Sequence, residues 1–212
     1  MKEPRWPSAL AVLAAVGLYA TLPNILVPGP SWVRFVVPVL FLAVLVPLAV
    51  TAPHRHVEES GARRRAAMTL TALITFANAV ALAFLVHQLV YVSGVAGRTL
   101  LYGAFDIWVT NVIAFALWYW ELDGGGPPKR LADPKAPRDF AFIQMTDPEV
   151  AAPGWHPRFV DYLYVSFTNA SAFSPTDTMP LTRWAKLAML LQSAISLLTL
   201  LLVAARAVNI LR

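Results

Sequence analysis

The sequence predicts an all-α integral membrane protein with five transmembrane helices and a short re-entrant or interfacial helix before the last span. Three observations favour this fold class. Only 14% of the 212 residues are charged and 58% are hydrophobic, whereas about a quarter of the residues in a soluble domain are charged. The mean hydropathy is +0.58, and the apolar residues gather in long runs, as a bilayer requires. The chain has no cysteine, which excludes a disulfide-stapled secreted domain.

Crossing a hydrocarbon core about 30 Å thick takes about 20 apolar residues. A first run, 9–25, is shorter than this and meets Pro23. A secretory signal is the alternative for it, although Glu3 interrupts the basic leader and no small-residue cleavage site follows. The other four runs meet the length or come close to it, and they cover residues 33–50, 66–92, 100–120 and 185–210. We therefore expect five spans, with residues 1–120 forming a four-helix transmembrane region.

The basic residues predict which way the bundle sits. With the N-terminus inside, 13 of the 17 lysines and arginines fall on the inner side, and the Arg63–Arg65 triplet begins the third span there. We expect a cytoplasmic N-terminus and an outer C-terminus. Arginine exceeds lysine and alanine is plentiful, which favours a bacterial source and hence the cytoplasmic membrane. The net charge of +5 then reflects topology rather than nucleic-acid binding, and Arg63, Arg64 and Arg65 would contact anionic lipid headgroups.

Residues 121–157 are predicted to form a cytoplasmic loop. Three glycines and two prolines, Gly124 to Pro128, end the fourth span because neither residue type continues a helix well. Phe140 and Phe142 interrupt the polar stretch that follows, so we expect an ordered loop lying against the helix ends or the membrane face. Its six acidic residues leave an acidic metal site as an alternative, although their spacing is irregular.

Residues 158–212 are predicted to hold a short helical segment and then the last transmembrane helix. Residues 159–173 are too short and too polar for a comfortable span, and their aromatic residues begin at helical spacing. Such a segment either dips into the membrane, where protein or water must satisfy its backbone, or lies flat on the inner surface. Both arrangements stay open. The candidate pore-loop residues are Ser166, Thr168, Asn169, Ser171 and Asp177.

At these residues the sequence resembles the pore module of the potassium-channel superfamily, in which two helices flank a pore helix and loop. The run from Tyr164 to Ser171 is similar to the pore helix and its threonine signature, and Asp177, Pro180 and Thr182 are similar to the residues that follow the filter. The resemblance implies that residues 100–120 form the outer helix and 185–210 the inner helix. It covers about half of the chain.

Two departures limit what the resemblance implies. A potassium filter points consecutive carbonyls at the ion and needs glycine where its backbone turns to positive φ, but no glycine lies between Thr168 and Asp177. The charge distribution also places this loop on the cytoplasmic side, whereas a potassium-channel filter opens to the outside. Potassium selectivity is therefore not expected.

Ionisable residues inside a span are candidate functional residues because burying them in lipid is costly. Asp106 lies in the fourth span, and His87 lies near the outer end of the third. A short connection joins these spans, so His87 and Asp106 form a candidate intramembrane polar pair suited to proton handling. A buried hydrogen bond between helices is the alternative. Asn78 and Asn111 are expected to bond between helices.

The function that we expect is that of a channel-like or transporter-like polytopic membrane protein without a potassium-selective filter. The alternative is a non-catalytic membrane scaffold or regulatory subunit that presents its cytoplasmic loop to a partner. The sequence carries no zinc-helix, nucleophile-elbow or phosphate-loop motif, so we expect neither an enzyme nor a cofactor. Small residues four apart, such as Ala77 and Ala81, permit close helix packing, which leaves a homo-oligomer open.

Overall fold

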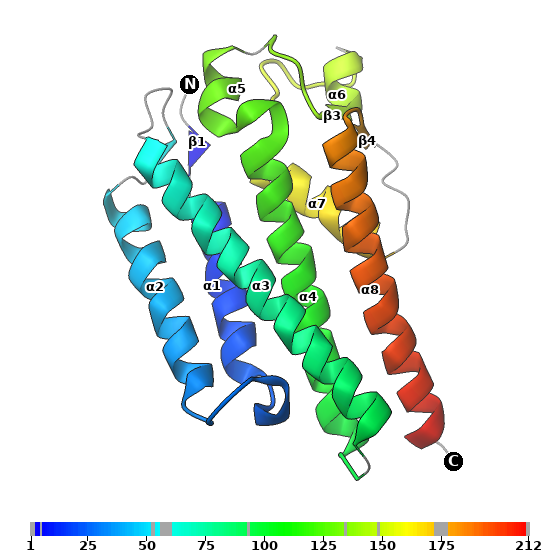
Figure 1. The fold of residues 1–212 in the computed structure, drawn as a ribbon. Coiled ribbons are helices and arrows are strands. Elements are labelled where there is room, and N and C mark those ends of the chain that lie inside the picture. Colours follow the sequence, from blue (N-terminus) through cyan, green and yellow to red (C-terminus); the bar gives the residue numbers. More distant parts are fainter. Residues whose placement is uncertain are drawn as a thin grey trace.

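The computed structural model of the chain describes residues 3–4, 6–51, 54–55, 61–92, 94–133, 135–147, 149–171 and 178–210. Five long helices run lengthwise through one bundle, and α1 begins at the opposite end from the one where α8 finishes (Figure 1). They are α1 (Trp6–Thr21), α2 (Val33–Thr51), α3 (Gly61–Tyr91), α4 (Gly97–Leu122) and α8 (Arg183–Ile210).

Four of these helices, α2, α3, α4 and α8, are long and apolar enough to cross a membrane. This confirms the prediction of a mostly helical chain with helices that could span a membrane. Helix α1 has 16 residues, a length of about 24 Å, and is shorter than the hydrocarbon core. Helix α3 begins at Gly61, five residues before the predicted run, because an apolar run marks the part of a helix suited to lipid and not the end of the helix itself.

Short elements connect the long helices at the end where α1 begins. Strand β1 (Glu3–Pro4) pairs with β2 (His54–Arg55), and β3 (Phe140–Phe142) pairs antiparallel with β4 (Thr178–Pro180). Helices α5 (Pro127–Ala132), α6 (Ile143–Thr146) and α7 (Phe159–Ala170) and the 3-10 turn Asp123–Gly125 follow α4. A second 3-10 turn, Asn24–Leu26, lies at the opposite end of the bundle, between α1 and α2 (Figure 1). The sequence analysis anticipated α7 and missed the strands.

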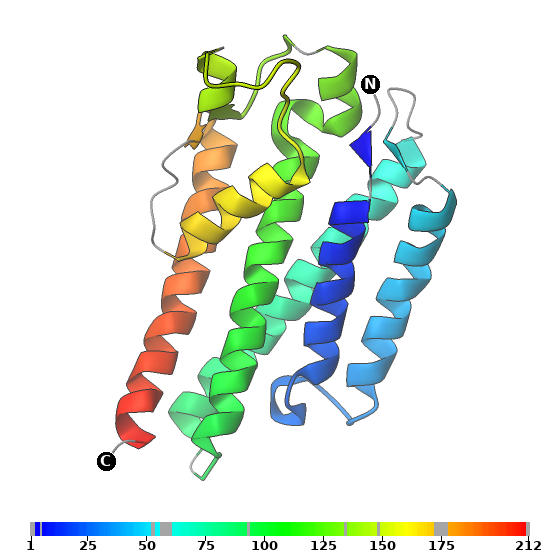
Figure 2. The ribbon, with the colours of Figure 1, turned by 180° about the vertical axis from the view of Figure 1, so that it is seen from behind.

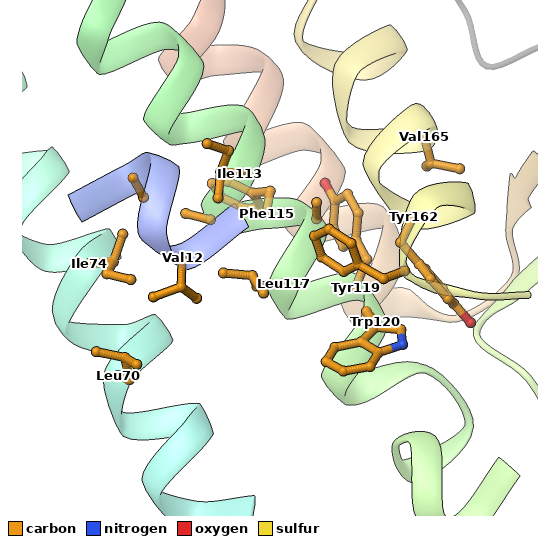
Figure 3. Close-up of a cluster of buried hydrophobic side chains, with 14 of the residues drawn as sticks. Val12, Leu70, Ile74, Ile113, Phe115, Leu117, Tyr119, Trp120, Tyr162 and Val165 are labelled. Carbon is orange, nitrogen blue, oxygen red and sulfur yellow. The ribbon is translucent and has the colours of Figure 1, made fainter. Parts of the chain in front are cut away.

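Helix α4 is the centre of the bundle and contacts α1, α3, α7 and α8. Its buried side chains face two ways (Figure 3). Leu117 lies toward α1 and α3, which contribute Val12 and Leu70, whereas Tyr119 lies toward Tyr162 of α7. The core is therefore continuous from one side of α4 to the other.

Helix α8 has the reverse of the polarity expected in water. Its buried face carries Gln192, Ser196 and Thr199, whose relative exposures are 0%, 1% and 1%. Its exposed face is formed by large apolar side chains, namely Leu187, Leu190, Leu191, Leu197, Leu198, Leu200 and Leu201. A surface helix of a soluble protein turns its apolar stripe inward, so this arrangement matches a helix whose outer face is solvated by lipid tails.

Candidate functional site

Helix α7 lies obliquely between α4 and α8, so that it starts near the end of the bundle and descends along α4 toward the middle of α8 (Figure 2). The backbone N–H of Arg158 donates to Asp161 Oδ2 at 2.7 Å, which fixes the start of the helix. One face of α7 is buried and includes Tyr162, Val165 and Ser166.

The buried face of α7 meets a group of polar side chains that we call the Gln192 cluster: Tyr119, Ser166, Asn169, Gln192 and Ser193. The Gln192 amide is its hub. The hydroxyl of Tyr119 donates to Gln192 Oε1 at 2.6 Å and Asn169 Nδ2 donates to the same oxygen at 2.9 Å. Gln192 Nε2 donates to the Ser166 carbonyl at 2.9 Å and lies 2.6 Å from Ser166 Oγ. Three helices are joined through one side chain.

Further hydrogen bonds attach α7 to the backbones of its neighbours. Ser166 Oγ donates to the Val112 carbonyl at 2.7 Å, and Asn169 Nδ2 donates to the Met189 carbonyl at 2.9 Å. Val112 lies ten residues before the end of α4, and Gln192 lies nine residues after the start of α8. At 1.5 Å per residue the attachment points are about 14–15 Å from these helix ends.

The candidate pore-loop residues have different positions. Ser166 and Asn169 belong to the Gln192 cluster. The hydroxyl of Thr168 donates within α7 to the Tyr164 carbonyl at 2.9 Å, and that of Ser171 donates to the Phe167 carbonyl at 2.7 Å. Asp177 lies outside the described residues.

The sequence analysis missed Tyr119, Gln192 and Ser193. A signal for Gln192 was present, because Gln192, Ser196 and Thr199 recur at four and three residues and so share one face of α8. Asn111 does bond between helices as predicted, since its Nδ2 donates to Ser196 Oγ at 2.9 Å.

The other candidate pair, His87 and Asp106, has separate partners. Asp106 Oδ2 accepts a hydrogen bond from the hydroxyl of Thr21 at 3.2 Å. The His87 ring is exposed and packs on Tyr91, with 5.4 Å between the ring centroids. Helix α1 therefore supplies a partner for Asp106 that the short α3–α4 connection did not predict, and a proton-handling role for the pair stays a prediction.

The loop after α4 folds into a second polar region around Asp123, which is fully buried. The hydroxyl of Tyr162 donates to Asp123 Oδ2 at 2.6 Å, and the backbone N–H groups of Asp139 and Phe140 donate to Oδ1 at 2.7 and 3.2 Å. Asp139 in turn accepts from Trp184 Nε1 at 2.7 Å. The loop thus lies against the ends of α4, α7 and α8.

Arg130, a residue of α5, completes this region. Its Nη1 donates to the carbonyls of Trp120 and Asp123, each at 2.7 Å, and its guanidinium lies 5.2 Å from the centroid of the Tyr162 ring. Burial lowers the pKa of the neighbouring Arg138 guanidinium, and the Asp123 carboxylate offsets part of this effect.

Among the described residues, no group of three or more histidine, cysteine, aspartate or glutamate side chains is arranged to hold a metal ion. A cavity of about 40 Å³ lies between α1, α2, α3 and α4, with Ser8, Thr71 and Glu121 among its lining residues. Its volume is sufficient for a few water molecules.

Neither the protein-family models nor the curated proteins nor the solved structures with which the chain was compared match it. The geometry of the Gln192 cluster and of the loop after α4 is therefore the basis for the function proposed below.

Proposed function

We propose that the chain is the subunit of a channel-like or transporter-like membrane protein in which α1, α2, α3, α4 and α8 cross the membrane and α7 is re-entrant. The observation that carries this proposal is the depth at which α7 is attached to its neighbours. Ser166 bonds to Val112, and both Ser166 and Asn169 bond to Gln192, about 14–15 Å from the nearer helix ends.

A helix lying flat on the membrane surface would contact only the ends of the spans. Helix α7 instead places its polar side chains against the middle of α4 and the second and third turns of α8. Irregular backbone at membrane depth is stable only where protein or water satisfies its polar groups, and the Gln192 cluster satisfies those at the buried end of α7.

Helices α4, α7 and α8 have the order of a pore module, with an outer helix, a short inclined helix and an inner helix. The cavity between α1, α2, α3 and α4, of about 40 Å³, holds only a few water molecules and is too small to form a pathway. The face of α7 that points away from the bundle exposes Val160, Tyr164 and Phe167. We therefore place the pathway between several copies of the chain, with this face turned toward the neighbouring copy.

The proposed orientation has the N-terminus in the cytoplasm of a bacterial cell. Arg63, Arg64, Lys129 and Arg130 all lie at the end of the bundle where α1 begins (Figure 1), and basic residues near short loops mark the cytoplasmic side. Because the segment between Thr168 and Asp177 contains no glycine, the proposed pathway does not select potassium.

Two measurements on purified protein in liposomes test the proposal. The first follows sodium, potassium and chloride flux under imposed gradients. We expect flux in the wild type, a strong reduction in Gln192→Leu, and wild-type flux in Thr199→Val, which removes a buried hydroxyl that donates to the Ile195 carbonyl of α8. The second measures cysteine accessibility in this cysteine-free chain. Ser171→Cys should react more slowly with an impermeant maleimide than the exposed Thr146→Cys.

Two outcomes would overturn the proposal. Folded protein that passes no ion under any gradient would leave the scaffold function as the remaining candidate. Equal labelling of Ser171→Cys and Thr146→Cys from the aqueous side would remove the re-entrant helix.

A further inference from the structure

Four basic side chains converge on three consecutive glycines at the end of α4. Gly124, Gly125 and Gly126 have φ values of +58°, +80° and +98°, in the region that favours glycine. We call this segment the glycine turn. A methyl group built at Gly124 would lie 3.2 Å from Arg138 Nη1, and one at Gly126 would lie 2.9 Å from Arg64 Nη2.

Lys129 and Arg130 approach the same turn. The Lys129 ammonium would lie 3.4 Å from a methyl group at Gly125, and Arg130 Cγ would lie 3.3 Å from one at Gly124. Lys129 is exposed and Arg64 is half-buried, so both can be reached from outside the protein. The missing side chains of the glycines allow four cations to approach one stretch of backbone.

Three carboxylates near the turn, those of Glu121, Asp123 and Asp139, are buried or half-buried, whereas that of Asp133 is exposed and offsets part of the lowering that burial causes in the pKa of Arg138. Asp123 is fully buried and accepts from Tyr162 and from two backbone N–H groups. Asp139 accepts from the Gly124 N–H at 2.8 Å and from Trp184. Glu121 is 2% exposed and lines the cavity between α1 and α4. The exposed Lys129 and the half-buried Arg64 are the basic groups at the turn that a ligand can reach.

The guanidinium groups of Arg64 and Arg130 bond to neutral carbonyls. Arg64 Nη2 donates to the Glu121 carbonyl at 3.1 Å, and Arg130 Nη1 donates to two carbonyls. Two enclosed donors, Arg64 Nε and Arg130 Nη2, have no hydrogen-bond partner within the part of the chain that the structure describes. Enclosed donors of charged groups are normally hydrogen-bonded. These two lie beside a turn whose Gly124 N–H already donates to the Asp139 carboxylate.

We propose that the glycine turn, with Arg64 and Lys129, is a binding site for a phosphate group. Guanidinium and ammonium groups are the donors that would recognise the phosphate, because the N–H groups of Gly124 and Gly126 already donate to Asp139 Oδ2 and to the Asp123 carbonyl. The phosphate is that of an anionic lipid headgroup at the inner interface or a free phosphate. The site depends on neither flux nor the oligomeric state, so its test is separate from that of the proposed function.

The test uses the full-length protein in detergent and four lipid or ion probes. Native mass spectrometry measures retention of phosphatidate and phosphatidylglycerol against phosphatidylcholine, and thermal unfolding measures stabilisation by inorganic phosphate. We expect the wild type to prefer the anionic lipids. The Arg64→Gln/Lys129→Gln variant should lose about 30-fold in affinity, because each basic residue at an anionic surface contributes about fivefold.

A matched variant controls for the loss of two charges. Arg34→Gln/Arg98→Gln removes two arginines at the opposite end of the bundle and should keep the preference. Lys129→Gln alone should lose about fivefold in affinity for the anionic lipids. Because Lys129 is exposed, this single variant keeps the site testable if the double variant does not fold.

Each outcome decides the proposal. Lipid preference that the Arg64/Lys129 variant loses supports a lipid headgroup as the ligand. Stabilisation by inorganic phosphate without lipid preference, lost in the same variant, supports a free phosphate. Equal binding of all lipids with no effect of phosphate would overturn the site, as would an equal loss in the Arg34/Arg98 control.

Discussion

Replacing Gln192 by leucine tests whether the Gln192 cluster holds α7 in place. Leucine has nearly the same size and fills the same space, but it removes the acceptor for Tyr119 and Asn169 and the donor for Ser166. Asn169 keeps its bond to the Met189 carbonyl. The hydroxyl of Tyr119 would be left without its acceptor in a buried site.

The expected loss of stability in Gln192→Leu follows from the four hydrogen bonds that the substitution removes. Interhelical hydrogen bonds in membrane proteins contribute about 0.6 kcal/mol each on average, so Gln192→Leu should lower the free energy of unfolding by about 2 kcal/mol. The Tyr119–Gln192 bond is short, at 2.6 Å. A double-mutant cycle with Tyr119→Phe should therefore give a coupling energy of about 0.6–1.7 kcal/mol for this pair.

The assay is reversible unfolding in lipid bicelles, measured for both single variants and the double variant. Thr199→Val is the control, because Thr199 is equally buried and its hydroxyl donates to the Ile195 carbonyl of its own helix. Thr199→Val should lower the free energy of unfolding by less than about 1 kcal/mol. Its effect and that of Tyr119→Phe should be additive in the double variant. Full stability in Gln192→Leu, or strict additivity with Tyr119→Phe, would refute the reasoning.

Two further predictions concern the loop after α4. Gly126 has φ +98° and ψ 168°, a region that essentially only glycine occupies, and a methyl group there would lie 2.8 Å from a carbonyl oxygen of α4. Gly126→Ala should therefore lower the melting temperature and reduce the free energy of unfolding by at least about 1 kcal/mol. Gly17→Ala is the control and should cause no such loss, because nothing lies within 4 Å of the added methyl group. Asp123→Asn places an N–H₂ group among three hydrogen-bond donors, so thermal unfolding should show that the free energy of unfolding falls by about 3 kcal/mol. A decrease no greater than that of Asp133→Asn, a change at an exposed residue, would contradict the role of Asp123.

The long helices could be predicted because the bilayer imposes one length on every span. The apolar runs marked α2, α3, α4 and α8 within a few residues, and the start of α7 followed from its aromatic spacing. Strands β3 and β4 could not be predicted in the same way. Their pairing joins Phe140 to Pro180, segments 40 residues apart, and three residues are too few for an alternating pattern to predict a strand.

The candidate site was predicted in part, for a physical reason. Ser166 and Asn169 were selected as polar residues in a short helix, and they do join the cluster. Gln192 was not predicted because leucines surround it in the sequence. A hydropathy average over such a window stays high even when the window contains one polar residue. The partner of Asp106 was missed because Thr21 comes from α1, 85 positions away, and sequence proximity favoured His87.

The reversed polarity of α8 has a consequence for which substitutions the helix tolerates. Its many leucines contact a fluid that accepts any apolar shape, so exchanging them for isoleucine, valine or phenylalanine should change little. The few hydrogen-bonding side chains on the inward face have fixed partners and no such freedom. A saturation survey of α8 should therefore find its sensitive positions among its polar residues, the opposite of the pattern along a helix that folds in water.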